Sequence, residues 1–106
     1  MMVGLTFTPR DVLRRERSRI VSFLTERGAR DVRVFGSVAR EEDDDRSDLD
    51  LMVDLETPRS TGSELLVVLG LSEELSAMLG THVDVVTPRT LKPEVREAAL
   101  AEAIPL

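Results

Sequence analysis

Two closely spaced aspartates and an upstream Gly-Ser pair are the residues of this chain best suited to chemistry. Asp48 and Asp50 flank one leucine, and ten residues separate them from Gly36-Ser37. Side chains at i and i+2 of a strand share a face, with Cα atoms roughly 6.6 Å apart. Such paired carboxylates repel each other unless a cation lies between them, and Mg²⁺ binds through one or two carboxylates plus substrate phosphates.

The Gly36-Ser37 pair adds a second feature of a phosphate site. Glycine after a strand permits a tight turn and close approach of the backbone to a ligand, and serine offers an N–H and a hydroxyl to phosphate oxygens. Each motif by itself also fits a plain structure, a hairpin turn for the glycine and the polar face of an edge strand for the aspartates. Their combination at the ends of two strands favours metal-assisted phosphate chemistry.

The alternation of apolar and polar residues predicts the strands that position the aspartates and the Gly-Ser pair. Residues 32–35 lead into the glycine, and apolar and polar residues alternate over 48–55. A third strand is predicted over 83–86, where Asp84 shares its face with the residue two positions before it. We expect carboxylates on one face of the sheet and the core on the other, and we interpret His82 as an ordinary surface imidazole.

The first predicted helix has clear boundary signals and a dense set of arginines. Thr8 is a suitable N-cap, Pro9 fits the first helical position, and Gly28 marks the end. Five arginines crowd its first half, and they form either a solvated face or a surface that meets phosphates or an acidic partner. They are Arg10, Arg14, Arg15, Arg17 and Arg19.

Two further helices complete the predicted fold. One runs from about residue 64 to 79, and the other opens at Lys92-Pro93. The apolar positions assigned to the longer helix are Leu65, Leu66, Leu69, Leu75, Met78 and Leu79. The order is α-β-β-α-β-α, with an antiparallel first strand pair and a parallel crossover into the third strand. We expect an α/β (α+β) fold, a small mixed sheet with helices packed on it, in one domain over residues 1–106.

The charge distribution limits the partners. The net charge is −6, yet residues 1–40 hold nine Lys/Arg against four Asp/Glu, whereas 41–106 hold five against sixteen. Direct nucleic-acid binding is not expected, because the acidic majority of the chain would repel the phosphates. The chain also has three Phe and no Trp or Tyr, so it offers few aromatic side chains on which bases could stack. Absence of cysteine excludes disulfides and thiolate chemistry. Without a long apolar run or a signal pattern, we expect a cytoplasmic protein with no membrane association.

The loop after Ser37 carries five consecutive acids at 41–45. We interpret this run as a solvated loop, because like charges repel one another and favour exposure. It would repel an incoming triphosphate unless it moves outward or a metal accompanies the nucleotide. Arg40 is the candidate positive charge that offsets this repulsion, and its alternative role is a salt bridge to one of these acids.

The pattern GS-x10-DxD, embedded as FGSVAR…RSDLDL, resembles the signature of the DNA-polymerase-β-like nucleotidyltransferase superfamily. By length it is most similar to the minimal nucleotidyltransferase (MNT) branch, the antitoxin-like partners of HEPN ribonuclease toxins. VDVVTP at 83–88 and LKPEVREAAL at 91–100 resemble that family's third strand and closing helix. Glu41 departs from the pattern, because glycine usually follows the arginine in the family.

The resemblance implies transfer of AMP from ATP to a tyrosine of an HEPN toxin, with two Mg²⁺ ions. The implied catalytic and metal-ligating residues are Asp48, Asp50 and Asp84, the last also serving as general base. The implied nucleotide-binding residues are Gly36, Ser37 and Arg40. Glu41 favours a rival interpretation, a non-catalytic antitoxin that neutralises its toxin by binding. Transfer to a small molecule is disfavoured, since the chain is too short for a second substrate domain.

Overall fold

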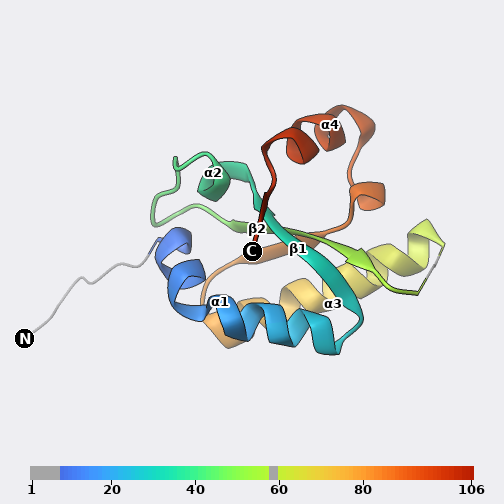
Figure 1. Ribbon diagram of the computed structural model, residues 1–106, viewed down its shortest axis with the longest axis horizontal. Helices are drawn as coiled ribbons and strands as arrows, with labels where there is room; N and C mark the ends of the chain where they lie inside the picture. The colour runs from blue at the N-terminus through green and yellow to red at the C-terminus, as the bar shows by residue number, and fades with distance from the viewer. Residues whose placement is uncertain (1–7, 58–59) are drawn as a thin grey trace, which may run out of the picture.

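The computed structural model describes residues 8–57 and 60–106, which form a sheet between two layers of helices (Figure 1). The elements in order are α1 (Pro9–Glu26), β1 (Ala29–Phe35), α2 (Gly36–Ala39), β2 (Leu49–Leu55), α3 (Thr61–Leu79), β3 (Val83–Val86), the 3-10 turn η1 (Pro88–Thr90), α4 (Pro93–Glu102) and β4 (Ile104–Pro105). The predicted order α-β-β-α-β-α is confirmed. The sequence did not predict the short elements α2, η1 and β4.

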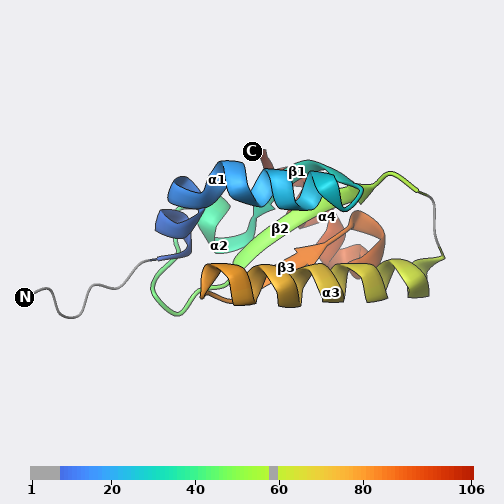
Figure 2. The ribbon, with the colours of Figure 1, turned by 90° about the horizontal axis from the view of Figure 1, so that it is seen from below.

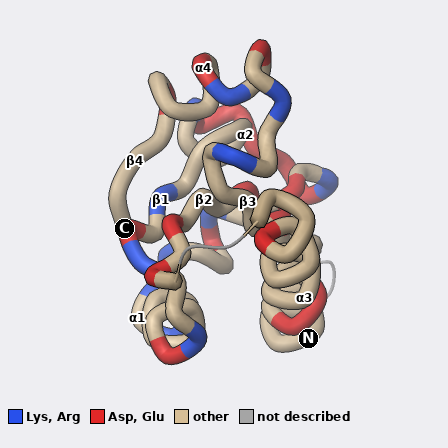
Figure 3. Tube along the Cα trace, turned by 90° about the vertical axis from the view of Figure 1, so that its right-hand side faces the viewer, with Lys and Arg blue, Asp and Glu red and all other residues tan. Residues whose placement is uncertain are grey.

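The four strands form one mixed sheet in the order β3-β2-β1-β4. β1 runs antiparallel to β2 and β4, while β2 and β3 are parallel, as expected for a crossover through a helix. The helices α1 and α3 cover one face, and α2 and α4 lie on the other (Figures 1 and 2). Viewed from the side, α1 lies below the β1 side of the sheet and α3 below β3 (Figure 3).

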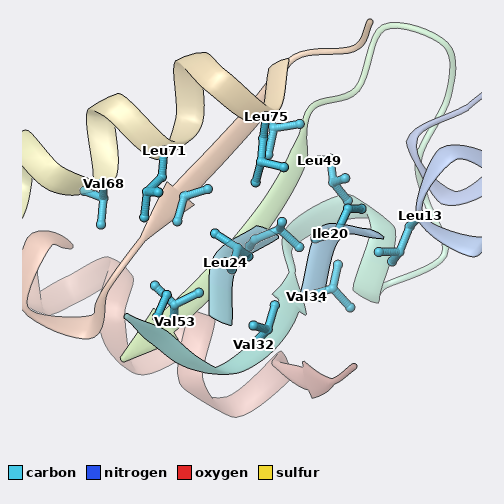
Figure 4. Packing of buried hydrophobic residues seen from close by; sticks show 14 of the residues in the cluster. Leu13, Ile20, Leu24, Val32, Val34, Leu49, Val53, Val68, Leu71 and Leu75 are labelled. Atoms are coloured by element: carbon cyan, nitrogen blue, oxygen red, sulfur yellow. The ribbon is translucent and has the colours of Figure 1, made fainter. Parts of the chain in front are cut away.

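The main core lies between the sheet and the layer formed by α1 and α3 (Figure 4). Alternate residues of each strand point into it, which confirms the alternation predicted for residues 48–55. Its buried side chains include Ile20, Leu24, Val32, Val34, Leu49, Leu51, Val53, Val68, Leu71 and Leu75.

A second, smaller apolar cluster lies on the opposite face of the sheet, the face on which the carboxylates were expected. Phe35, Met52, Val86 and Ala99 are buried there beneath α4. The alternation of β2 places Met52 on the same face as Asp50, and α4 covers that part of the face. The face expected to carry the carboxylates therefore also carries a small apolar core beyond Asp50.

The longer helix α3 differs from its prediction in both its start and its buried face. It begins at Thr61, because the Ser60 hydroxyl caps it by accepting the Ser63 N–H at 3.2 Å. The side chains assigned to the apolar stripe are largely exposed at its first turns, with exposed fractions of 44%, 72% and 52% at Leu65, Leu66 and Leu69. Val68 and Leu71 face the core instead, while the predicted Leu75 is buried there and the predicted Met78 and Leu79 pack against it.

Two serines fix the rotation of α3 by binding the outer edge of β3. Ser76 Oγ accepts the Val83 N–H at 2.9 Å, and Ser72 Oγ accepts the Val85 N–H at 2.8 Å. Ser76 Oγ also donates to the Val83 carbonyl at 3.2 Å. Because α3 is apolar on several sides, its periodicity does not select a face, and these hydrogen bonds do.

The boundary signals of α1 are confirmed. Thr8 accepts the Asp11 N–H, and the Asp11 carboxylate accepts the Thr8 N–H, which together form a capping box. Gly28 has a φ of +81°, which lets the chain turn from α1 into β1. In the part of the chain that the structure describes, no helix has the length and apolar character needed to cross a membrane.

Glu41 adopts a left-handed backbone conformation with a φ of +59°. An L side chain there costs roughly 1–2 kcal/mol, since its Cβ approaches the following carbonyl. This strain gives a physical reason why glycine suits the position.

Glu41→Gly should therefore raise the free energy of unfolding by about 0.5–1 kcal/mol, after the larger entropy of glycine in the unfolded chain is subtracted. Urea unfolding measures the change. Asp45→Gly is the matched control, because it removes the same charge from the loop where φ is not positive. A gain of equal size in both variants would attribute the effect to charge and contradict the backbone argument.

Candidate active site

Asp50 and Asp84 are direct neighbours in the parallel ladder between β2 and β3. Both residues are partly buried on the same face of the sheet. Neither carboxylate makes a hydrogen bond or an ion pair within the described residues. Two adjacent acids without a donor are electrostatically unfavourable, and an oxygen-binding cation would relieve that repulsion.

The protonation behaviour of these acids reflects the same environment. Burial and, after it, the nearby charges of Asp84 and Asp48 raise the pKa of Asp50 to about 6, while His82 and Arg40 act in the opposite direction. Burial also raises the pKa of Asp84, partly offset by His82. Both carboxylates consequently hold protons more tightly than an exposed aspartate.

Asp48 pairs with His82 at the entrance to the two parallel strands. Its Oδ1 lies 3.1 Å from His82 Nδ1, and both side chains are more than half exposed. The interpretation of His82 as an ordinary surface imidazole is therefore incomplete. The spacing contained a signal for this contact, since His82 precedes Asp84 by two residues just as Asp48 precedes Asp50.

The predicted set of three metal ligands does not converge in this conformation. Asp48 is directed to His82, which leaves the pair formed by Asp50 and Asp84. Over residues 8–57 and 60–106, no three His, Cys, Asp or Glu side chains are grouped closely enough to hold a metal ion.

Gly36 brings the start of α2 directly against the carboxylate of Asp50. Its φ is +74°, and a Cβ built there would overlap Asp50 Oδ2. Glycine is required at this position on both counts. The loop predicted to bind phosphate thus lies beside the predicted metal ligand, because Phe35 pairs with Asp50 across the antiparallel ladder.

Ser37 and Arg40, the other predicted nucleotide ligands, differ in their availability. The Ser37 hydroxyl makes no hydrogen bond within the described residues and is half-buried. Arg40 is engaged, because its Nε donates to Glu42 at 2.8 Å and its Nη1 donates to Glu102 at 3.0 and 3.1 Å. The alternative of a salt bridge from Arg40 to the acidic run is present in the pair with Glu42.

Glu102 is a residue of this region that sequence reasoning missed. Its Oε1 accepts the Gly36 N–H at 2.8 Å, although 66 residues separate the two positions. No local motif marks a contact of this range, and the sequence offers no signal for it beyond a glutamate in the last helix.

The acidic run is more ordered than the solvated loop that was expected. Four of its members are exposed, but the side chain of Asp43 is fully buried. Asp43 accepts the Arg10 N–H at 3.0 Å and lies 3.4 Å from Arg10 Nε. The loop is therefore fixed to the start of α1, where unpaired backbone N–H groups attract a carboxylate.

A groove of about 320 Å³ opens beside the carboxylates, between α3 and the edge of β3. It is lined by Leu69, Ser72, Glu73, Ser76, His82, Val83 and Asp84. A larger hollow of about 430 Å³ between α1, β1 and the C-terminal residues contains none of the predicted site residues. Of these two hollows, the smaller one contains a predicted site residue, Asp84.

The raised pKa of Asp50 leads to a prediction about stability in the presence of EDTA. A carboxyl whose folded pKa is raised stabilises the fold fully below its unfolded pKa near 4, and this contribution is lost as the pH rises through about 6. Asp50→Asn replaces the ionising carboxyl by a neutral amide. The variant should therefore have a higher free energy of unfolding than wild type at pH 8, by about 1–2 kcal/mol after allowance for solvent screening.

Urea unfolding of wild type and variant at pH 5.5 and pH 8 measures this difference. The gain should shrink at the lower pH, where the wild-type carboxyl is largely protonated. Asp45→Asn, in the exposed loop, is the control. A gain at pH 8 that persists unchanged at pH 5.5 would be inconsistent with a titrating Asp50.

Sequence and structure comparisons agree with this geometry. Residues 15–106 match the family model described as a nucleotidyltransferase domain. A Methanocaldococcus jannaschii protein provisionally named protein adenylyltransferase MJ0435 is 34% identical over 81% of this chain and 88% of its own length. Protein adenylyltransferase MntA of Thermococcus cleftensis is 40% identical over 73% of this chain and 74% of its own length.

A solved structure described provisionally as a minimal nucleotidyltransferase has 42% sequence identity, covers 99% of this chain and 100% of its own, and gives a TM-score of 0.74. The family match spans most of the chain, including the two strands that carry Asp50 and Asp84 and the Gly36 loop that precedes them. The chain therefore belongs to the nucleotidyltransferase domain family.

Proposed function

We propose that this chain transfers AMP from ATP to a tyrosine of an HEPN-type toxin and so acts as the antitoxin of a toxin–antitoxin pair. The observation that carries the proposal is the contact of the Gly36 backbone with Asp50, because it supports a role for the loop in holding phosphate beside carboxylates that have no other partner within the described residues. Both curated relatives described above are named protein adenylyltransferases, which supports a protein acceptor.

Two further solved structures share the fold at low identity. They are a toxin–antitoxin complex described as MntA-HpeT and a toxin–antitoxin structure with AMP-PNP, with TM-scores of 0.67 and 0.65 at 18% and 17% identity. At that identity they bear on the fold alone. The toxin as partner and ATP as substrate thus belong to the proposal.

The donor set fits a hard divalent cation such as Mg²⁺. Asp50 and Asp84 present oxygen atoms from adjacent strands and lack any other partner within the described residues. Asp48 would join them by exchanging His82 for the ion, and two ions are proposed by analogy with the family resemblance. When bound, Mg²⁺ would neutralise the charge that develops on the phosphates.

The chain's own residues account for the remaining requirements. Ser37 would donate its free hydroxyl and N–H to the outer phosphates of ATP. Asp84, with its raised pKa, would accept the proton of the attacking tyrosine hydroxyl. The tyrosine oxygen would then bond to the α-phosphorus, the bond from that phosphorus to the leaving oxygen would break, and pyrophosphate would depart.

The groove beside Asp84 gives this acceptor a way in. It is bounded on one side by α3 and on the other by His82 and Asp84, and it is open to the surface. A hydroxyl that enters there approaches Asp84 without crossing the Gly36 loop.

ATP binding should require a divalent ion, because a triphosphate would otherwise meet three aspartates and the acidic loop without neutralisation. Titration calorimetry with MgATP and with ATP in EDTA measures this. We expect heat of binding in the first case and none in the second, and equal affinity in both would refute the metal assignment.

Asp48→Asn with Asp50→Asn should abolish AMP transfer and leave the fold intact, because each change is nearly isosteric. The assay combines the chain, MgATP and the product of the neighbouring gene as candidate acceptor, with intact mass read by mass spectrometry. Wild type should add one AMP and the double variant none. Asp54→Asn, four positions further along β2, is the matched control and should retain transfer.

The same assay distinguishes the rival function. If wild type and double variant both neutralise the toxin and neither adds mass, the chain is a non-catalytic antitoxin. The left-handed backbone of Glu41, directly after the segment from Gly36 to Arg40, is the structural feature that favours this non-catalytic interpretation.

A further inference from the structure

One carboxylate from the last helix spans both ends of the short helix α2. Glu102 Oε1 accepts the Gly36 N–H at 2.8 Å, at the first residue of α2. The same carboxylate accepts from Arg40 Nη1 at 3.0 and 3.1 Å, and Arg40 is the residue that ends α2. The Glu102 side chain is 25% exposed, so these hydrogen bonds are partly shielded from water.

Both contacts satisfy groups that α2 cannot satisfy itself. The N–H of a first helical residue has no partner within its helix, and in a helix of four residues this is a large share of the backbone donors. Arg40 lies beside a run of acids, and its pair with Glu102 directs its guanidinium away from exclusive pairing with Glu42. Glu102 thus holds the Gly36 backbone at the start of α2 and the Arg40 side chain at its end.

The position of Glu102 is itself fixed by the sheet. The two residues of β4 pair with Arg33 and Val34, directly before the strand enters the Gly36 loop. The Leu106 N–H also donates to the Val32 carbonyl at 3.0 Å. The chain on the C-terminal side of Glu102 is therefore hydrogen-bonded to the same strand that delivers Gly36.

Packing fixes the chain on the N-terminal side of Glu102. Ala99, one turn before it, is buried against Phe35 and Met52. Because both flanks are attached to β1, the backbone of Glu102 is held beside the loop, within reach of Gly36 and Arg40.

We propose that Glu102 is the positioning residue of the phosphate loop: it holds the segment from Gly36 to Arg40 in the conformation that presents Ser37 to a nucleotide. This inference rests on the proposed nucleotide binding by that loop. Glu102 is not a nucleotide ligand, since its charge is used by Arg40 and Gly36 and would repel a phosphate. The opposite arrangement, in which Glu102 occupies the phosphate position and must be displaced, predicts the opposite sign for every variant below.

The test compares Glu102→Ala, Glu102→Gln and the control Glu97→Ala, whose parent side chain is exposed on the same helix. The first readout is the backbone amide signal of Gly36 in a ¹⁵N correlation spectrum without nucleotide. It should move in Glu102→Ala and stay close to wild type in Glu97→Ala. Glutamine keeps an oxygen acceptor, so Glu102→Gln should give an intermediate shift.

The second readout is MgATP affinity by calorimetry, with no acceptor protein present. We expect Glu102→Ala to weaken binding by about tenfold or more, because it leaves the Gly36 N–H and Arg40 without this partner. Glu102→Gln should weaken it by no more than about threefold, because glutamine keeps an oxygen acceptor and loses only the added strength of the charged hydrogen bonds. Glu97→Ala should bind as wild type does. Rescue by glutamine separates positioning from a general loss of stability, which thermal melting of each variant monitors.

If Glu102→Ala does not fold, Glu102→Asp replaces it, because the shorter side chain keeps the charge but withdraws the carboxylate from Gly36. Tighter ATP binding by either variant, or unchanged binding with a displaced Gly36 signal, would overturn the positioning role. An unmoved Gly36 signal would overturn the contact itself. Absence of ATP binding by wild type would instead overturn the proposed function and, with it, this role, whereas the Gly36 signal still reports on the contact.

Discussion

The repulsion between two partly buried carboxylates is the constraint on which the architecture of the candidate site depends. Asp50 and Asp84 are held side by side by the parallel register of β2 and β3, and no donor within the described residues compensates them. The main core on the far side of the sheet supplies the free energy that keeps these strands paired. In such a site the two carboxylates repel each other, and binding of a cation would remove that repulsion.

Gly36, the residue at which β1 passes into α2, brings the backbone of the loop next to the Asp50 carboxylate. Any side chain at Gly36 would collide with Asp50, so the backbone of the loop lies as near to the carboxylate as the chain permits. The same residue carries the left-handed φ that starts α2 and offers its N–H to Glu102. The positive φ and the lack of space for a Cβ both explain why a glycine is found there.

The sequence predicted those parts of the fold and site that depend on local pattern. Alternation over 48–55 located β2 and its two aspartates, and the capping signals located α1. Side-chain contacts that depend on the exact strand register or on distant segments were not predicted. The pairing of His82 with Asp48 depends on the register between parallel strands, and the contact of Glu102 depends on β4, a strand of two residues. For α3, an almost continuous apolar sequence left the buried face undetermined until its serines were seen to bind β3.

Those serine hydroxyls also decide how another protein can attach to the sheet. An exposed edge strand is an open template for a further strand, whether from a partner or from a second copy of the same chain. At β3 the outward N–H groups of Val83 and Val85 are already taken by α3, so a strand added there would have to compete with hydroxyls held on a helix. This edge is therefore protected against sheet extension and aggregation, and a partner that reaches the carboxylates from this side must be recognised through its side chains.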